Sequence, residues 1–280
     1  MLLSAFLEKT ERSFAVAGIE SARADAELLV AHSLGISRGE IQAKAIVGDS
    51  FEPSQDLLEF VARREAREPL QHLTGEAYFR NLTLEVGKGV FIPRPETELL
   101  TQLAIDAASR FDSPVVVDLC AGSGAIGIAI ATELPQAAVY AVEKSEDAFY
   151  YTKANYEKLA PSATVVLGDA LSALDELVGR VNVLVSNPPY IPAEMVPIYP
   201  EVALHDPDLA LYSGADGLDL IRAISKRGLE LVVPGGTIAI EHADMQSEAV
   251  VKLLVADGWL NVVDHRDFND RPRAVIGIRA

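Results

Sequence analysis

Apolar residues in the first 70 positions of the chain recur at helical spacing. One stripe begins at Leu3, and Ser21 stands where it can cap a second helix. Ser37 and Glu40 have the spacing of a capping box, which predicts a third helix. A fourth helix is expected over residues 54–68, ended by Pro69. Four short helices joined by short loops predict a small helical bundle.

The pattern changes after Pro69. Residues 78–79 and 82–86 flank Arg80-Asn81, which is typical of an extended or hairpin connector. Pro95 suits the first turn of a helix, and this helix should run to about Ser109.

From Val115 onward, short apolar runs alternate with helical periodicity. Alternation of this kind predicts a mainly parallel sheet with helices on both faces, and such sheets bind ligands beyond the carboxyl ends of their strands. The expected strands are 115–119, 137–142, 164–167, 181–186, 237–241, 260–265 and 274–278. The expected helices lie after 124, near 147–159, near 218–231 and near 247–256.

Composition narrows the class of protein. Lys and Arg number 24 and Asp and Glu 41, a net charge of −17, which argues against a protein that grips nucleic acid through its phosphates. The single cysteine, Cys120, excludes an internal disulfide, and the scattered histidines give no metal-ligand spacing, so no metal is expected. Neither a signal peptide nor a membrane-spanning run is recognisable, and we expect a cytoplasmic protein.

A glycine-rich turn follows the first predicted strand. Residues 118–127 read DLCAGSGAIG, and Gly122 to Gly127 fit G-x-G-x-x-G, a turn that lets a ligand approach the backbone at a helix N-terminus. Glu143 ends the next strand and could accept hydrogen bonds from a ribose diol. Together they indicate a cofactor containing adenosine. Asp118 would repel a pyrophosphate and favour a cofactor with a positive amino group, which tilts the choice from a nicotinamide dinucleotide toward S-adenosylmethionine.

A second motif, Asn187-Pro188-Pro189-Tyr190, follows the fourth predicted strand. Here the chain resembles the class I S-adenosylmethionine-dependent methyltransferases that modify planar amide or amino nitrogens. The resemblance implies that the Asn187 side-chain oxygen and the Pro188 carbonyl each accept one N–H bond from the target nitrogen, which orients that nitrogen and favours its developing charge. It also implies that Tyr190 offers an aromatic face to the planar target group.

Further motifs resemble the release factor glutamine N5-methyltransferases. They are EPLQHLTG at 68–75 and FIPRPETE at 91–98, with DAELL at 25–29, residues 201–218 and Arg271-Pro272-Arg273 in support. The resemblance covers nearly the whole chain. It implies methyl transfer from S-adenosylmethionine to the glutamine amide of the Gly-Gly-Gln loop in peptide chain release factors.

The implied architecture is a Rossmann-like class I methyltransferase sheet, mainly parallel with an antiparallel strand near the C-terminus, beside a small N-terminal helical bundle. We expect a substrate-docking domain over 1–72, a β-hairpin connector over 73–92 and a catalytic domain over 93–280. The expected partner is the release factor alone, without direct contact to nucleic acid or membrane, and the expected state is a monomer.

The resemblance also assigns site residues. The catalytic residues would be Asn187, Pro188 and Tyr190, and Pro189 would join them in holding the glutamine. Phe91 and Arg94 would neighbour the cofactor. The cofactor-binding residues would be Cys120, Ala121, Gly122, Ser123, Gly124, Glu143, Asp169, Ala170 and Asn187.

The chain departs from the family pattern at three of these positions. Cys120 stands where the family usually has Gly, and a Cys adopts a positive φ less freely. Glu143 stands where Asp is also common. Ala170 stands where relatives can carry an aromatic residue, so adenine stacking there would be weaker.

Three other interpretations remain open at this point. An adenine N6-methyltransferase acting on nucleic acid uses a related motif, but the net charge of −17 argues against it. A nicotinamide-dependent oxidoreductase would leave Asn187 to Tyr190 unexplained. A docking module with a vestigial pocket would not need intact glycines together with an intact N-P-P-Y motif.

Overall fold

The computed structural model describes all 280 residues and divides into two compact units. The first comprises Met1–Glu76 together with Pro197–His205, and the second comprises Ala77–Val196 and Asp206–Ala280. The chain therefore leaves the second unit after Val196, contributes a short segment to the first, and returns at Asp206. None of the helices is both long and apolar enough to cross a lipid bilayer.

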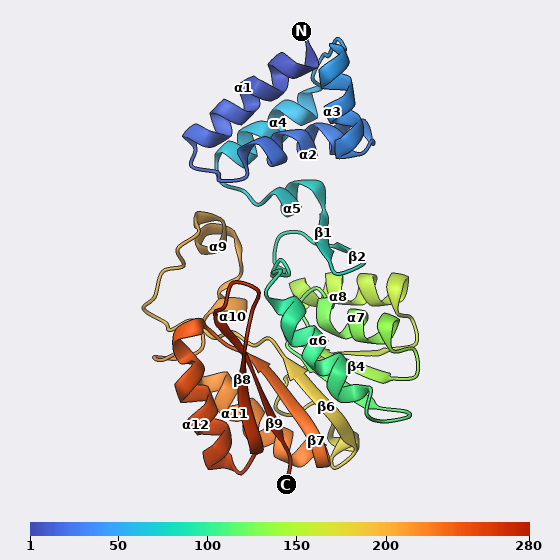
Figure 1. Ribbon diagram of the computed structural model, residues 1–280, viewed down its shortest axis with the longest axis vertical. Helices are drawn as coiled ribbons and strands as arrows, with labels where there is room; N and C mark the ends of the chain where they lie inside the picture. Colours follow the sequence, from blue (N-terminus) through green and yellow to red (C-terminus); the bar gives the residue numbers. More distant parts are fainter. The chain divides into compact units, whose positions relative to one another are not determined.

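The first unit is a bundle of helices around a small apolar core, and its N-terminal helices are drawn in blue in Figure 1. The capping box predicted at Ser37 and Glu40 is present: the Ser37 side chain accepts from the Glu40 N–H, and the Glu40 side chain accepts from the Ser37 N–H. The helices are α1 (Leu3–Val16), α2 (Ala22–Leu34), α3 (Arg38–Val47), α4 (Gln55–Glu65), α5 (Leu70–Thr74) and α9 (Pro200–His205). Their buried core includes Leu7, Phe14, Leu29, Ile41 and Leu57.

Three details of this bundle differ from the sequence prediction. Ser21 occupies the N-cap position of α2, but its side chain makes no capping hydrogen bond. Helix α4 ends at Glu65 rather than Glu68, because Arg67 adopts a positive φ of 70° that no helix accommodates. The segment after Pro69 then forms α5, which periodicity could not reveal in five residues.

A buried ion cluster ties α9 to the bundle. Arg64 donates from Nε to Asp25 Oδ2 at 2.8 Å and from Nη1 to Glu201 Oε1 at 2.9 Å. Arg67 donates from Nη2 to the other oxygen of Glu201 at 2.6 Å. Asp25 and Arg64 are both 5% exposed, so each charge needs its partner.

The second unit begins with the predicted hairpin, β1 (Glu76–Phe79) and β2 (Leu82–Glu85), whose turn contains Arg80 at a positive φ of 50°. A seven-stranded sheet follows, in the order β5-β4-β3-β6-β7-β9-β8. All of its strands run in one direction except β9, which lies antiparallel between β7 and β8. Their bounds are β3 (Val115–Leu119), β4 (Ala138–Glu143), β5 (Thr164–Leu167), β6 (Val181–Ser186), β7 (Val232–Glu241), β8 (Leu260–Arg266) and β9 (Pro272–Ile278).

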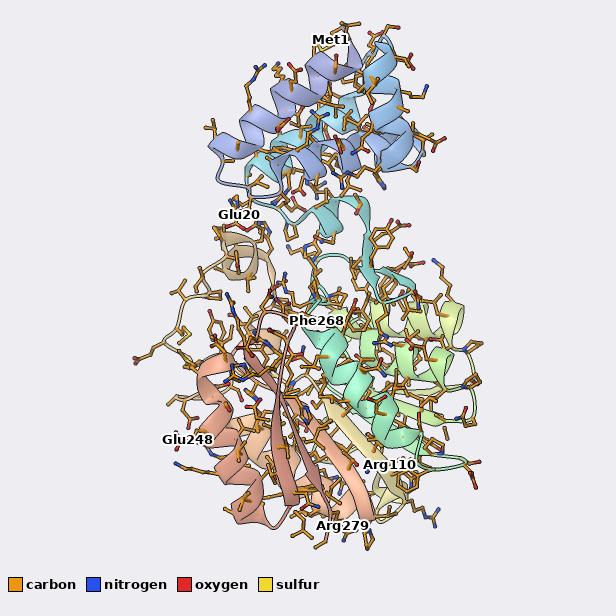
Figure 2. All side chains as sticks on the ribbon, in the orientation of Figure 1. Met1, Glu20, Arg110, Glu248, Phe268 and Arg279 are labelled. Carbon is orange, nitrogen blue, oxygen red and sulfur yellow. The ribbon has the colours of Figure 1, made fainter.

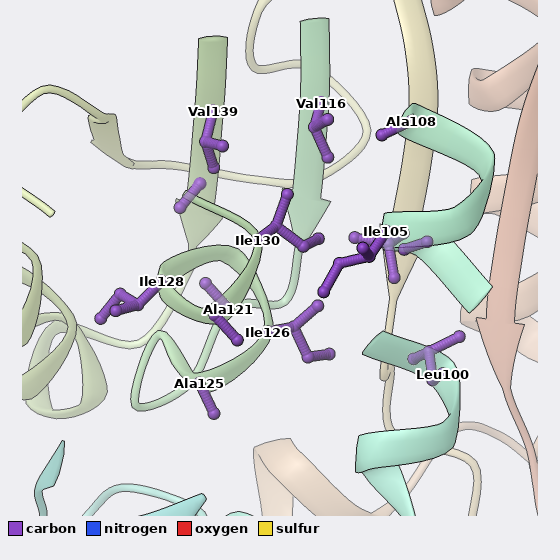
Figure 3. Close-up of a cluster of buried hydrophobic side chains, with 14 of the residues drawn as sticks. Leu100, Ile105, Ala108, Val116, Ala121, Ala125, Ile126, Ile128, Ile130 and Val139 are labelled. Atoms are coloured by element: carbon purple, nitrogen blue, oxygen red, sulfur yellow. The ribbon is translucent and has the colours of Figure 1, made fainter. Parts of the chain in front are cut away.

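Helices cover both faces of this sheet (Figure 1). Successive residues of a strand point to opposite faces, so Val116 joins one apolar cluster and Val117 the other. The first cluster packs against α6 (Thr97–Ala108), α7 (Ala125–Glu133) and α8 (Glu146–Leu159), and Figure 3 shows α7 side chains lying between the strands and α6. The second packs against α11 (Asp219–Leu231) and α12 (Ser247–Asp257).

A side-chain hydrogen bond just after α6 joins this helix to the sheet. Arg110, labelled in Figure 2, donates from Nη2 to Thr237 Oγ1 at 2.8 Å and so ties the end of α6 to β7. Strand β7 starts at Val232, five positions earlier than expected, because residues 234–236 continue the strand through an irregularity in its pairing with β6. The sequence did not predict four short elements. They are the helices α9 and α10 (Asp208–Leu211) and the 3-10 turns η1 (Asp175–Leu177) and η2 (Asp244–Gln246).

Candidate active site

The glycine-rich turn leaves the carboxyl end of β3 and enters α7. Cys120, Gly122 and Gly124 have φ values of 64°, 55° and 86°, so every second residue of the turn is left-handed. Cys120 therefore occupies a conformation that glycine adopts without strain and that costs other residues about 1–2 kcal/mol. A Cβ built on Gly122 would meet no atom within 4 Å, so the backbone here faces open space.

Glu143, at the end of β4, lies directly against this turn. Its Oε2 accepts from the Gly122 N–H at 2.8 Å, and its Oε1 accepts from the Ser145 N–H at 2.7 Å. The side chain is 8% exposed, so its remaining lone pairs are held in a fixed direction beside the open backbone of Gly122.

Asp118 has a different position from the one its sequence context suggested. It is fully buried, and its Oδ2 accepts from the Gly127 N–H of α7 at 2.9 Å. Burial raises the pKa of Asp118 to about 7, and the hydrogen bond from Gly127 opposes this only in part. Asp118 thus fastens α7 to β3, and its interpretation as the partner of a cofactor amino group is wrong.

Asp169 and Ala170 follow β5 at the same edge of the sheet. The Gly168 N–H donates to the Glu143 carbonyl at 2.8 Å, which joins the ends of β4 and β5. Asp169 accepts from the Leu171 N–H and from Lys144 Nζ, each at 2.9 Å, and these bonds lower its pKa. Ala170 is buried in the same apolar cluster against which Cys120 packs.

The N-P-P-Y motif emerges at the switch point of the sheet. Strand β3 pairs in parallel with β4 on one side and with β6 on the other, and Leu119 is in register with Ser186. Ser186 Oγ donates to the Leu119 carbonyl at 2.7 Å. Asn187 therefore starts beside Cys120, which brings the two sequence motifs together where ligands bind in such sheets.

Residues from three other elements hold the motif in place. Asn187 Nδ2 donates to Thr97 Oγ1 at 3.3 Å, and Tyr190 Oη donates to Glu241 Oε1 at 3.2 Å. Gln246 Nε2 donates to the Tyr190 carbonyl at 2.8 Å. These contacts fix both ends of the motif, so the Asn187 and Tyr190 side chains are positioned before a substrate arrives.

Sequence reasoning missed Thr97, Glu241, Gln246 and Gly217. Glu241 had a usable signal, because it ends a strand at the same edge of the sheet as Glu143. Gly217 had none: its φ is 78°, and a Cβ there would lie 2.1 Å from the Tyr190 carbonyl oxygen, a contact that only the folded chain reveals.

Burial shifts the pKa of two ionisable groups near the motif, Glu241 and Cys120. Burial raises the pKa of Glu241 to about 7, opposed by hydrogen bonds from Thr97 and Tyr190 and by the positive charge of Arg273. Burial raises the pKa of the Cys120 thiol to about 12, so the thiol stays protonated near neutral pH. Cys120 is therefore a strained packing residue of the turn rather than a nucleophile.

Arg94 lies against Phe91, with its guanidinium carbon 5.0 Å from the ring centroid. Its Nη2 donates to Asp206 Oδ2 at 2.9 Å. Burial raises the pKa of Asp206 to about 6, and Arg94 opposes that shift. The pair fixes the segment between α9 and α10 to the start of α6.

The sheet is similar to that of a ribosomal protein L11 methylase from Lactobacillus delbrueckii subsp. bulgaricus. The TM-score is 0.50 at 16% identity, over 70% of this chain and 83% of that one, which shows a shared fold. Residues 82–196 match the model of the "Methyltransferase small domain". Fold and site together define a Rossmann-like methyltransferase, with the antiparallel strand near the C-terminus and the helical N-terminal region that the sequence predicted.

Full-length relatives identify the family. Residues 5–75 match the model of the "PrmC N-terminal domain". The chain is 48% identical to the release factor glutamine methyltransferase of Streptomyces coelicolor, over 98% of this chain and 96% of that protein. The chain belongs to the release factor glutamine methyltransferase family.

One relative in the same range of similarity is a methyltransferase with a different name. The chain is 36% identical to the 4-amino-L-phenylalanine/4-methylamino-L-phenylalanine methyltransferase of Streptomyces pristinaespiralis, over 96% of this chain and 92% of that protein. Similarity along the whole chain therefore fixes the family more firmly than it fixes the molecule that receives the methyl group.

Proposed function

We propose that this chain transfers a methyl group from S-adenosylmethionine to the N5 side-chain amide nitrogen of the glutamine in the Gly-Gly-Gln loop of peptide chain release factors. The observation that carries the proposal is the position of Asn187 at the carboxyl end of β6, beside the glycine turn after β3. The relatives named release factor glutamine methyltransferase supply the substrate.

The residues of the turn fit an adenosine-containing methyl donor. The open backbone at Gly122 leaves room for the methionine part beside Cys120 to Gly124. The free lone pairs of Glu143 suit the two ribose hydroxyls, and Asp169 and Ala170 would flank the adenine. Bound there, S-adenosylmethionine supplies an electrophilic methyl group on a positively charged sulfur.

The chain's own residues would act on the amide nitrogen. Asn187 Oδ1 and the Pro188 carbonyl would each accept one N–H, which holds the nitrogen in line with the methyl group. Such alignment contributes on the order of 7–11 kcal/mol to lowering a barrier. The nitrogen gains the methyl group and loses one proton. Tyr190, fixed through its hydroxyl by Glu241, would stack on the planar amide, and Pro189 would stiffen the loop.

The helical part of the chain is proposed to dock the release factor, with 1–72 as docking domain, 73–92 as connector and 93–280 as catalytic domain. The protein is proposed to act as a cytoplasmic monomer without direct contact to nucleic acid. Hydrogen exchange of the full chain with and without a release factor tests the docking role: protection within residues 1–72 supports it, and protection confined to the catalytic domain contradicts it.

Mass spectrometry of a recombinant release factor, after incubation with the protein and S-adenosylmethionine, tests the reaction. We expect one added methyl group on the glutamine of the Gly-Gly-Gln loop. An unmodified glutamine under conditions where the donor binds would contradict the proposed substrate.

An aromatic amine is the second candidate substrate, favoured by the Streptomyces pristinaespiralis relative. Its amino nitrogen is also planar and carries N–H groups for the same two acceptors. Incubation with 4-amino-L-phenylalanine in place of the release factor decides between the two substrates. If the amino acid is methylated and the release factor is not, the substrate is an aromatic amine.

A further inference from the structure

The side-chain amide of Asn187 can face a substrate in two ways. If Oδ1 faces outward it accepts a hydrogen bond, and if the NH2 group faces outward it donates one. The two orientations have almost the same shape, so only the surrounding hydrogen bonds can select between them. A glutamine amide nitrogen, which donates, needs the first orientation.

Thr97 is the residue that touches the inner side of this amide. Asn187 Nδ2 donates to Thr97 Oγ1 at 3.3 Å, and Thr97 is 3% exposed. A hydroxyl can donate as well as accept, so Thr97 alone does not select an orientation. The direction of its own proton decides the matter.

Glu241 determines where the Thr97 proton points. Its carboxylate is 1% exposed and, when ionised, can only accept hydrogen bonds. Tyr190 Oη donates to Oε1 at 3.2 Å, whereas Oε2 is buried and accepts no hydrogen bond. The Thr97 hydroxyl is near enough to this carboxyl to lower its pKa. A buried carboxylate oxygen left without a donor is costly, so the Thr97 proton is drawn toward Glu241.

We propose that Thr97 and Glu241 are positioning residues that turn the Asn187 amide so that Oδ1, rather than the NH2 group, faces the substrate. With its proton directed to Glu241, the Thr97 oxygen can only accept from Asn187. The NH2 group is therefore held inward. This inference rests on the proposed function, because it presumes a substrate nitrogen that donates.

The same arrangement discriminates between chemical groups. A glutamate in place of the target glutamine presents a carboxylate, which only accepts hydrogen bonds. It would need the opposite orientation of Asn187 and would break the bond to Thr97. The loss of one such bond to a buried group corresponds to a factor of about 10–100 in affinity.

Substitutions at Thr97 test the proposal. Thr97→Val removes the hydroxyl and keeps the shape, Thr97→Ser keeps the hydroxyl, and Thr101→Val is the matched control. Thr101 lies one turn later on α6, is fully buried, and donates to the Thr97 carbonyl at 3.0 Å rather than to Asn187. Binding is measured at pH 8.5, where Glu241 is ionised, with a release factor carrying the Gly-Gly-Gln loop and with its Gly-Gly-Glu variant.

In Thr97→Val we expect the preference for the glutamine protein over the glutamate protein to fall about 10–100-fold. Thr97→Ser and Thr101→Val should keep the wild-type preference within threefold. The affinity for S-adenosylmethionine should stay unchanged in all three. A preference in Thr97→Val equal to that in Thr97→Ser would overturn the proposal. If Thr97→Val does not fold, Glu241→Gln takes its place, since its amide can donate to Thr97 and should lower the preference too.

A second measurement uses no substrate and so separates this inference from the proposed function. The side-chain NH2 protons of Asn187, assigned by their loss in Asn187→Asp, are followed by NMR hydrogen exchange. We expect protection in wild type and Thr97→Ser and rapid exchange in Thr97→Val. Equal exchange in all three proteins would overturn the proposal even if the release factor is methylated. The expected protection without methylation of the release factor would support the orientation of Asn187 and contradict only the proposed substrate.

Discussion

Replacing Glu143 by Ala should weaken binding of S-adenosylmethionine by a factor that the geometry of its carboxylate predicts. A carboxylate has about four lone-pair positions. Two are used by the N–H groups of Gly122 and Ser145, which leaves two for the ribose hydroxyls. Each hydrogen bond to a charged group contributes about 1.5–3 kcal/mol, so the pair contributes about 3–6 kcal/mol, a factor of roughly 10² to 10⁴ in Kd.

Isothermal titration with S-adenosylmethionine measures this factor, and Glu146→Gln is the control because it removes an exposed acid three residues further on. Glu143 also holds Gly122, so a weaker Kd alone could report a distorted turn. A ligand comparison separates the two effects. In the wild type, 5′-methylthioadenosine should bind more tightly than its 2′-deoxy analogue, and in Glu143→Ala the two should bind equally.

Two results would refute the assignment of Glu143 to the ribose. One is a Kd for Glu143→Ala within threefold of the wild type. The other is a preference for the 2′-hydroxyl that persists in Glu143→Ala, since another residue would then accept from it.

The remaining predictions concern the motif, the bundle and pH. Asn187→Ala should lower methyl transfer by about 10²–10³-fold with donor affinity retained, as measured by mass spectrometry and titration; near-normal turnover would contradict its role. Arg64→Met leaves Asp25 buried without a partner and should destabilise α2 and α4 by about 3–5 kcal/mol in hydrogen exchange, whereas Arg63→Met, in an exposed pair, should cost at most about 1 kcal/mol. Burial raises the pKa of Asp118 from its ordinary value near 4 to about 7. The free energy of unfolding therefore falls as the pH rises from about 4 to about 7, because the folded protein resists the ionisation of Asp118. Asp118→Asn should therefore raise Tm at pH 8 and leave it unchanged near pH 4, and an equal shift at both would argue against the raised pKa.

The sequence predicted those parts of the fold that follow from local periodicity and from the glycine, proline and polar residues that bound each strand. Strand β3 and the capping box at Ser37 were predicted at their observed residues because each depends on a few neighbouring side chains. Helices α5 and α9 were not predicted, since five or six residues carry too little periodicity. Helix α9 is held instead by Glu201, whose partners lie far away in the sequence.

The candidate site divides in the same way. Asn187 and Gly122 belong to local motifs, so their positions could be predicted before the fold was known. Thr97 and Glu241 act on the site only through distant contacts, and nothing in a single sequence pairs residue 97 with residue 187. Asp118 was misjudged because the sequence shows that an acid ends the strand but not that its side chain turns into the protein toward α7.

The helical bundle is built from two separate stretches of the chain, and this limits how domains can be exchanged between homologues. Arg64 and Arg67 come from the N-terminal stretch, and Glu201 comes from the segment after N-P-P-Y. A chimera that exchanges residues 1–76 between two homologues inherits the arginines from one parent and the acid from the other. A graft of the bundle therefore has to include the segment after N-P-P-Y, so that Arg64, Arg67 and Glu201 come from the same parent.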